Sequence, residues 1–167
     1  MNLLALSLHA SEPALAARVE EQVDDTIIEK RNLHGFRVGY AYANNSEDSR
    51  RVSTPHMFVM GYELTQRLTG GDWLNVIAVE NVSLSGINQS LFLPSANLLV
   101  GFEFNEMAQL GVGPNINPFD PNEKYIHMVA AGGFTANAGD FNVPIHAYYI
   151  PDVDDDWRVG VTTGVNW

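Results

Sequence analysis

Cysteine is absent from this chain, and cations are scarce. Its 167 residues include no Cys, nine Lys and Arg together, and twenty Asp and Glu, so the formal net charge at pH 7 is −11. The absence of cysteine excludes a disulfide framework, a thiolate metal site and a cysteine nucleophile. The scarcity of cations argues against a nucleic-acid partner, because proteins that bind phosphates cluster Lys and Arg on one surface.

Long apolar runs are also missing. No stretch of the sequence approaches the roughly 18 consecutive apolar residues of a transmembrane helix. This test does not detect a membrane-spanning β-barrel, because only alternate residues of its strands contact lipid. The length is that of one domain with a core of its own.

The first part of the chain, residues 1–32, differs from the rest. Residues 2–8 form a short apolar run, and residues 14–16 fit the A-x-A pattern of a signal-peptide cleavage site, although no Lys or Arg follows Met1 directly. Residues 12–31 predict a helix, because apolar residues recur there at every fourth position. We expect residues 1–32 to be an export leader with a short surface helix.

From residue 33 onward the apolar residues alternate with small or polar ones. This period of two predicts eight β-strands separated by breaks rich in Gly, Asn, Asp and Pro. Strands in soluble proteins average about five or six residues, whereas a membrane-spanning strand needs about nine to eleven. The longer class fits the predicted strands, which are residues 33–44, 56–67, 73–84, 92–104, 107–116, 125–135, 141–150 and 157–167.

The two faces of these strands differ in size. One face is large and apolar, and the other is rich in Gly and Ala with a few charges. Solvent does not require small residues, but the interior of a narrow eight-stranded barrel does, because enclosed charged side chains need space beside them. We therefore expect the bulky face to contact lipid. Its representative residues are Phe36, Tyr40, Phe58, Phe102 and Val161.

The last predicted strand, WRVGVTTGVNW, begins on Trp157 and ends on Trp167. Indole rings favour membrane interfaces. An alternating strand that ends on an aromatic residue resembles the C-terminal strand of bacterial outer-membrane β-barrel proteins, in which it is the assembly signal. At the level of pattern, residues 33–167 resemble small OmpA- and OmpX-like barrels.

The resemblance implies an all-β fold, an eight-stranded antiparallel up-and-down transmembrane β-barrel behind the N-terminal helical leader. It implies location in the bacterial outer membrane and three partners: the lipid bilayer, lipopolysaccharide and the outer-membrane assembly machinery. No cofactor is expected, and an envelope protein partner stays unidentified. Both chain ends would lie in the periplasm, with short turns on that side and longer loops outside.

Charged residues on the narrow face are expected to pair inside the lumen. Arg37 and Glu63 lie at similar heights on neighbouring strands, so we predict an ion pair between them, with Glu103 nearby. Such a pair could gate the lumen or could simply fill it, and the second interpretation is favoured.

Four further residues are candidates for the lumen. We expect Arg158 and His127 near its outer end, and His146 and Glu80 nearer the middle, with Arg158 and Glu80 able to pair. Glu80 and its neighbour Asn81 must point to opposite faces, so one of them points to lipid unless a bulge intervenes.

Other chemistry has less support in the sequence. His127 with Ser83 or Ser85 would suit a lipid-modifying barrel enzyme, but no spaced motif for that activity is present. The acidic loop PDVDDDW could hold Ca²⁺ or bridge cations to lipopolysaccharide, yet it lacks the glycine and distal Glu of a Ca²⁺ loop. The metal candidates, for which a solvated acidic loop is the simpler explanation, are Asp152, Asp154 and Asp156.

The sequence thus favours a non-enzymatic membrane barrel with a structural, envelope-integrity or surface-interaction role and a lumen plugged by Arg, Glu and His side chains. A soluble or periplasmic barrel that carries a small hydrophobic ligand is the first alternative, and it requires the bulky face to point inward. A narrow ion-conducting pore and a lipid-modifying enzyme are the others.

Overall fold

The computed structural model describes residues 32–44, 54–119, 125–151 and 157–167. The predicted leader and helix at residues 1–31 and the metal candidates Asp152, Asp154 and Asp156 lie outside these ranges. Within the described ranges no helix has the length and apolar character needed to cross a bilayer.

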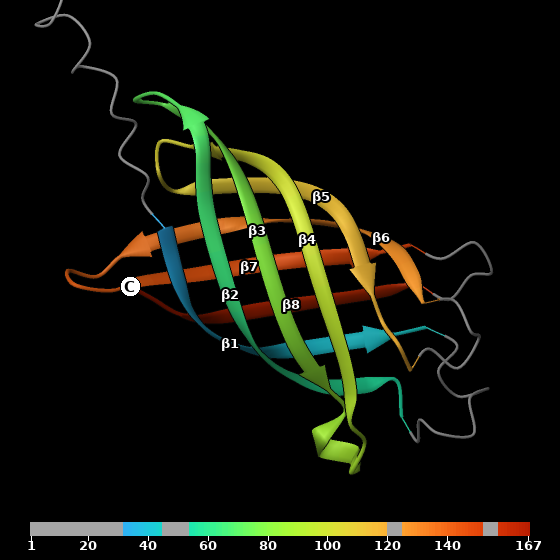
Figure 1. Cartoon of the computed structure of the whole chain (residues 1–167). Coiled ribbons are helices and arrows are strands. Elements are labelled where there is room, and N and C mark those ends of the chain that lie inside the picture. Colours follow the sequence, from blue (N-terminus) through green and yellow to red (C-terminus); the bar gives the residue numbers. More distant parts are fainter. Residues whose placement is uncertain (1–31, 45–53, 120–124, 152–156) are drawn as a thin grey trace, which may run out of the picture.

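Eight antiparallel strands form a closed barrel in which each strand pairs with the next and β8 pairs with β1 (Figure 1). This is the all-β, up-and-down architecture that the alternation predicts, and its closure leaves no unpaired sheet edge. The strands are β1 (Asn32–Ala43), β2 (His56–Gly70), β3 (Leu74–Ser85), β4 (Leu93–Phe104), β5 (Ala108–Ile116), β6 (Ile126–Asn137), β7 (Asn142–Ile150) and β8 (Arg158–Asn166).

The stagger of the strands makes the barrel narrow. Starting at Asn137 on β6, we step from each residue to its register partner on the next strand, through β7, β8 and β1 to β5. The circuit returns to β6 at His127, which lies ten residues before Asn137 in the chain. With about 3.3 Å per residue and 4.8 Å between strands, this offset tilts the strands by about 41° and gives a wall radius of about 8 Å. Such a lumen holds side chains but little else.

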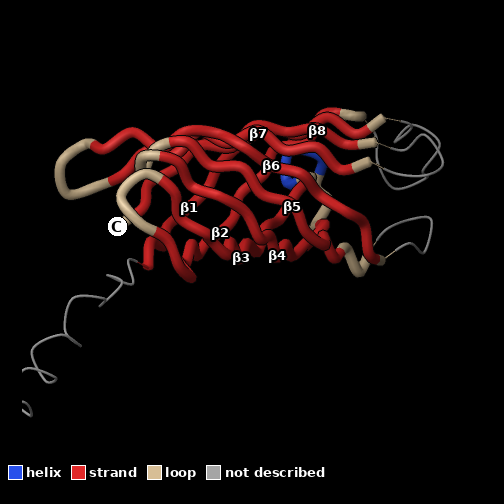
Figure 2. The backbone as a smooth tube through the Cα atoms, turned by 90° about the horizontal axis from the view of Figure 1, so that it is seen from above, coloured by secondary structure: helices blue, strands red, loops and turns tan. Residues whose placement is uncertain are grey.

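The two ends of the barrel differ. Residues 71–73, 105–107 and 138–141 join strands at the end where the C-terminus lies, which we call the turn end (Figure 2). Asn105 and Glu106 have φ of 48° and 58°, and the Phe104 carbonyl accepts a 3.0 Å bond from the Met107 amide, as in a type I′ turn. The opposite loop end carries the longer connections, including the 3₁₀ helix η2 (Ile87–Gln89). The predicted asymmetry of short turns and longer loops is confirmed.

β2 is longer than predicted. It continues to Gly70 rather than ending at residue 67, and its register with β3 shifts between Arg67 and Thr69. This bulge lets the strand bend at the turn end while Arg67 keeps its inward position. The other strand boundaries lie within two residues of the predicted ones.

Candidate functional site: charged clusters in the barrel lumen

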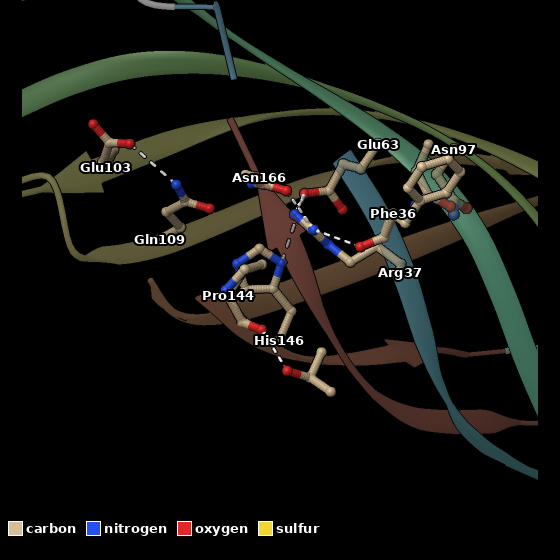
Figure 3. Close-up of polar contacts among 11 residues, drawn as sticks. Phe36, Arg37, Glu63, Asn97, Glu103, Gln109, Pro144, His146 and Asn166 are labelled. Atoms are coloured by element: carbon tan, nitrogen blue, oxygen red, sulfur yellow. Dashed lines mark hydrogen bonds and ion pairs between the residues drawn. The ribbon is translucent and has the colours of Figure 1, made fainter. Parts of the chain in front are cut away.

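The first cluster joins Arg37 on β1 to Glu63 on β2. Arg37 Nη2 donates to Glu63 Oε1 at 2.5 Å, and Nη1 donates to Asn166 Oδ1 at 2.5 Å and to the Phe36 carbonyl at 3.2 Å (Figure 3). The Arg37 and Glu63 side chains are 2% and 8% exposed. The structure therefore brings together the two residues of the predicted pair, and Arg37 also crosses to β8.

His146 on β7 adds a third titratable group to this cluster. Its Nδ1 lies 3.9 Å from Glu63 Oε1. Two glycines lie close both to the backbone of the next strand and to the charged groups. A Cβ on Gly133 would lie 2.1 Å from the Ile145 carbonyl oxygen and 2.6 Å from His146 Cδ2, and one on Gly164 would lie 1.8 Å from the Phe36 carbonyl oxygen and 3.1 Å from Arg37 Nη1. These two positions of the inner face therefore have no space for a larger residue.

The second cluster lies around Glu103 at the turn end of the lumen. Arg67 donates to Glu103 Oε1 through Nε at 2.8 Å and Nη2 at 2.5 Å, and its Nη1 reaches Glu106 Oε1 at 3.1 Å. Gln109 Nε2 donates to Glu103 Oε2 at 3.0 Å, and Asn75 Nδ2 to Oε1 at 3.3 Å. Glu103 is 1% exposed, so this carboxylate is buried with its hydrogen bonds satisfied.

The prediction for Glu103 therefore needs a correction. Glu103 bonds to Arg67 and not to the Arg37 cluster. Sequence reasoning missed Arg67 because it ended the second strand there. Alternation of Glu63 and Thr65 on the inner face, carried one step further, places Arg67 in the lumen.

The predicted pair of Glu80 and Arg158 is wrong. Glu80 is exposed on the outer surface, whereas Arg158 lines the lumen, so the barrel wall separates them. β3 pairs without a bulge around this position, and Asn81 is the neighbour that points inward. His127 faces inward near the loop end and is 7% exposed.

A row of asparagines in the lumen was not predicted. Asn81, Asn97 and Asn115 are direct register partners on β3, β4 and β5. Asn97 Nδ2 donates to Asn81 Oδ1 at 3.3 Å, and Asn115 Nδ2 donates to Asn97 Oδ1 at 2.5 Å. The row continues in register to Glu63 at one end and His127 at the other. The sequence shows that these amides lie on strands of alternating pattern, but it does not show that they are register partners.

A cavity of about 120 Å³ lies in the lumen and reaches from Arg37 and Glu63 to Arg158. The asparagine row forms part of its lining, together with buried apolar side chains of the loop-end half. Ser83 also lines it, and its hydroxyl lies 2.9 Å from that of Ser95. The apolar lining residues include Met57, Val59, Leu99, Val129 and Ile150.

The outer surface carries the bulky face. Phe36, Tyr40, Phe58, Phe102 and Val161 are 63%, 51%, 40%, 49% and 54% exposed. A barrel that carries a hydrophobic ligand would need these side chains inside, so their outward orientation contradicts that alternative.

The two tryptophans of the last strand lie at opposite ends of it. Trp167, at the turn end, has its ring 5.0 Å from His34 and 6.0 Å from Phe36. Trp157, at the loop end, lies 5.6 Å from the ring of Tyr42. Each indole is thus part of an aromatic cluster at one rim of the barrel.

In the described ranges no group of three or more His, Asp or Glu side chains is arranged to hold a metal ion.

No protein-family model matches the sequence, and no curated protein matches it either. Among solved structures, the chain is similar to the outer membrane protein Ail of Yersinia pestis in a phospholipid bilayer nanodisc. The match has 13% sequence identity and a TM-score of 0.45, and it covers 80% of this chain and 99% of that chain. The barrel topology follows from this chain's own strand pairing.

Proposed function

We propose that this chain is an integral β-barrel protein of the bacterial outer membrane with a structural or surface-interaction role. The observation that carries the proposal is the reversed distribution of side chains. Bulky apolar residues cover the outside of a closed wall, whereas glycine, alanine and hydrogen-bonded charges lie inside. Water would be in contact with these exposed apolar side chains, but acyl chains would bury them.

Strand dimensions and the rim aromatics support the same location. A twelve-residue strand tilted by about 41° rises about 30 Å, which matches the hydrocarbon thickness of a bilayer. Indole rings at both ends of β8, with the phenol ring of Tyr42 beside Trp157, suit the two membrane interfaces. Barrel closure also satisfies the backbone hydrogen bonds that lipid cannot.

The proposed partners are the bilayer, lipopolysaccharide at the loop end and the outer-membrane assembly machinery at the terminal strand. The last two rest on the resemblance of the C-terminal strand. The proposed role is envelope integrity or surface contact through the loops, without catalysis.

The lumen is proposed to be plugged. Arg37 with Glu63 and Arg67 with Glu103 occupy successive levels of a lumen whose wall radius is about 8 Å. A narrow ion pore is the second candidate, because the lining of the cavity of about 120 Å³ includes Arg158 near the loop end and Gln109, which bonds to Glu103 of the second cluster. Unitary conductance steps in planar bilayers would favour the pore over the plug.

Membrane fractionation followed by gel electrophoresis with and without boiling tests the proposal. Folded outer-membrane barrels stay compact in cold detergent, so we expect the protein in the outer-membrane fraction with a mobility shift on boiling. Recovery in the aqueous fraction without a shift would refute it.

A further inference from the structure

The loop-end half of the lumen carries apolar side chains. Two buried clusters lie there, and Tyr148 on β7 packs against both of them. Both clusters contribute side chains to the wall of the cavity of about 120 Å³. The members of the first cluster are Ala41, Ala43, Met57 and Val59, and those of the second are Leu99, Val129 and Ile150.

One side of the same cavity is polar. The asparagine row crosses β3, β4 and β5 there, and Ser83 and Ser95 lie beside it. The hydrogen bonds of the row end on Asn115, whose Nδ2 donates to Asn97. Asn115 Oδ1 accepts no hydrogen bond from the described part of the chain, although this side chain is only 1% exposed. A buried amide oxygen without a donor is costly, so a donor from a bound molecule would stabilise this position.

The unpaired oxygen lies beside the second apolar cluster. On β4, Leu99 follows Asn97, the register partner of Asn115, by two residues on the same inner face. On β6, Val129 pairs with Gly113, which precedes Asn115 by two residues. Water suits this boundary poorly, because a buried water needs several polar partners and an apolar wall offers none. A molecule with a donor at one end and an apolar body satisfies both surfaces.

We propose that the loop-end half of the lumen binds a small neutral molecule with an apolar body and one O–H or N–H donor. The donor bonds to Asn115 Oδ1, and the apolar body lies against Leu99, Val129 and Ile150. An engineered cavity of about 150 Å³ holds benzene, so a cavity of about 120 Å³ has the size for a molecule such as phenol.

The charges at the border of the cavity favour a neutral ligand. Arg37 and Glu63 line it and already bond to each other at 2.5 Å. A charged ligand would leave water for a wall that is largely apolar. Arg158 also lines the cavity, so an anion is the competing ligand class. The proposal goes beyond the structural role proposed above and does not depend on it, because the cavity belongs to the barrel itself.

Isoleucine methyl groups report binding on both sides of the barrel wall. Ile150 lines the cavity and is 5% exposed, whereas Ile145 on the same strand points outward and is 56% exposed. The chain is labelled with carbon-13 at the isoleucine δ1 methyls, folded in deuterated detergent, checked by the shift on boiling and titrated with phenol. We expect the Ile150 signal to saturate with a Kd on the order of 1 mM and to show NOE contacts to the phenol ring. The Ile145 signal should shift only in proportion to the phenol dissolved in the micelle.

Two alanine substitutions ask whether phenol lies in the cavity. Ala131→Leu fills the cavity beside the second cluster and should weaken phenol binding roughly tenfold or more. Ala130→Leu is the matched control, because Ala130 is the next residue of β6 and is exposed on the outer surface. It should leave the Kd unchanged.

Asn115→Leu tests the hydrogen bond. Phenol and toluene have the same number of non-hydrogen atoms, but only phenol has a donor. The ratio of their Kd values should change roughly three- to tenfold in favour of toluene in this variant, because one neutral hydrogen bond is lost. Asn137→Leu removes an amide that bonds to Asn142 outside the cavity lining, and it should leave the ratio unchanged.

Absence of saturation at Ile150, equal behaviour of Ile145 and Ile150, equal effects of the two alanine substitutions, or an unchanged ratio in Asn115→Leu would each overturn the inference. Tighter binding of benzoate than of phenol would overturn the neutral ligand class and assign the cavity to an anion. If either Ala131→Leu or Asn115→Leu does not fold, the other variant decides.

Discussion

Replacing Arg37 with alanine should leave Glu63 as a buried carboxylate without its cation. The two side chains are 2% and 8% exposed and lie 2.5 Å apart, so water cannot replace the lost partner easily. Removing one member of such a pair costs about 3–5 kcal/mol. Glu63→Ala should cost a similar amount, although Arg37 keeps its bonds to Asn166 and to the Phe36 carbonyl. The double variant lacks both charges, so neither is left buried without its partner. We expect it to be about 2–3 kcal/mol more stable than the sum of the two single losses predicts.

Equilibrium unfolding in denaturant measures these free energies. The protein is folded into phospholipid vesicles, and the folded fraction is followed by gel mobility and tryptophan fluorescence. The second cluster supplies matched controls. Arg37→Ala combined with Glu103→Ala should be additive within about 0.5 kcal/mol, because these residues share no bonded partner, whereas Arg67→Ala with Glu103→Ala should be coupled. Additive losses for Arg37 with Glu63, or equal coupling of Arg37 with Glu103, would refute the assigned pairing.

Two further substitutions test the wall of the barrel. Val161→Arg, near the middle of β8, should destabilise the barrel in a bilayer by about 2–4 kcal/mol in the same unfolding assay, and a nearly neutral effect would contradict lipid contact at this face. Gly133→Ala should cost about 1–3 kcal/mol, because its Cβ would lie 2.1 Å from the Ile145 carbonyl oxygen and 2.6 Å from His146 Cδ2. Gly71→Ala is its control, since no atom lies within 4 Å of the added Cβ, and equal losses at both glycines would argue against crowding in the lumen.

Much of the fold follows from local pattern. The period of two and the turn-like breaks predict eight strands, and the structure has eight. Small residues opposite Phe36 and Tyr40 predict which face is inside, because a barrel of this size has no room for bulky inward side chains. The Arg37–Glu63 contact was accessible because both residues lie on the inner face of consecutive strands, which pair with each other in an up-and-down barrel.

Contacts between residues on strands far apart in the chain, or next to a bulge, depend on the strand register. The sequence predicts this register poorly. The bulge after Arg67 and the continuation of β2 to Gly70 bring Arg67 to Glu103, 36 residues away. The contact of Arg37 with Asn166 across 129 residues exists only because β8 closes on β1.

The sequence by itself determined the alternation, the strand number and the inward or outward sense of the strands whose two faces differ clearly in size, because these depend on side-chain size and a period of two. Only the tertiary structure decided that Glu80 points outward while Asn81 points inward, since the pattern offered a polar residue to each face. It also decided the asparagine row, because a stagger of ten residues around eight strands aligns amides that lie 16 and 18 positions apart in the chain. Closure of the sheet is a global property, and the contacts that depend on it have no local signature.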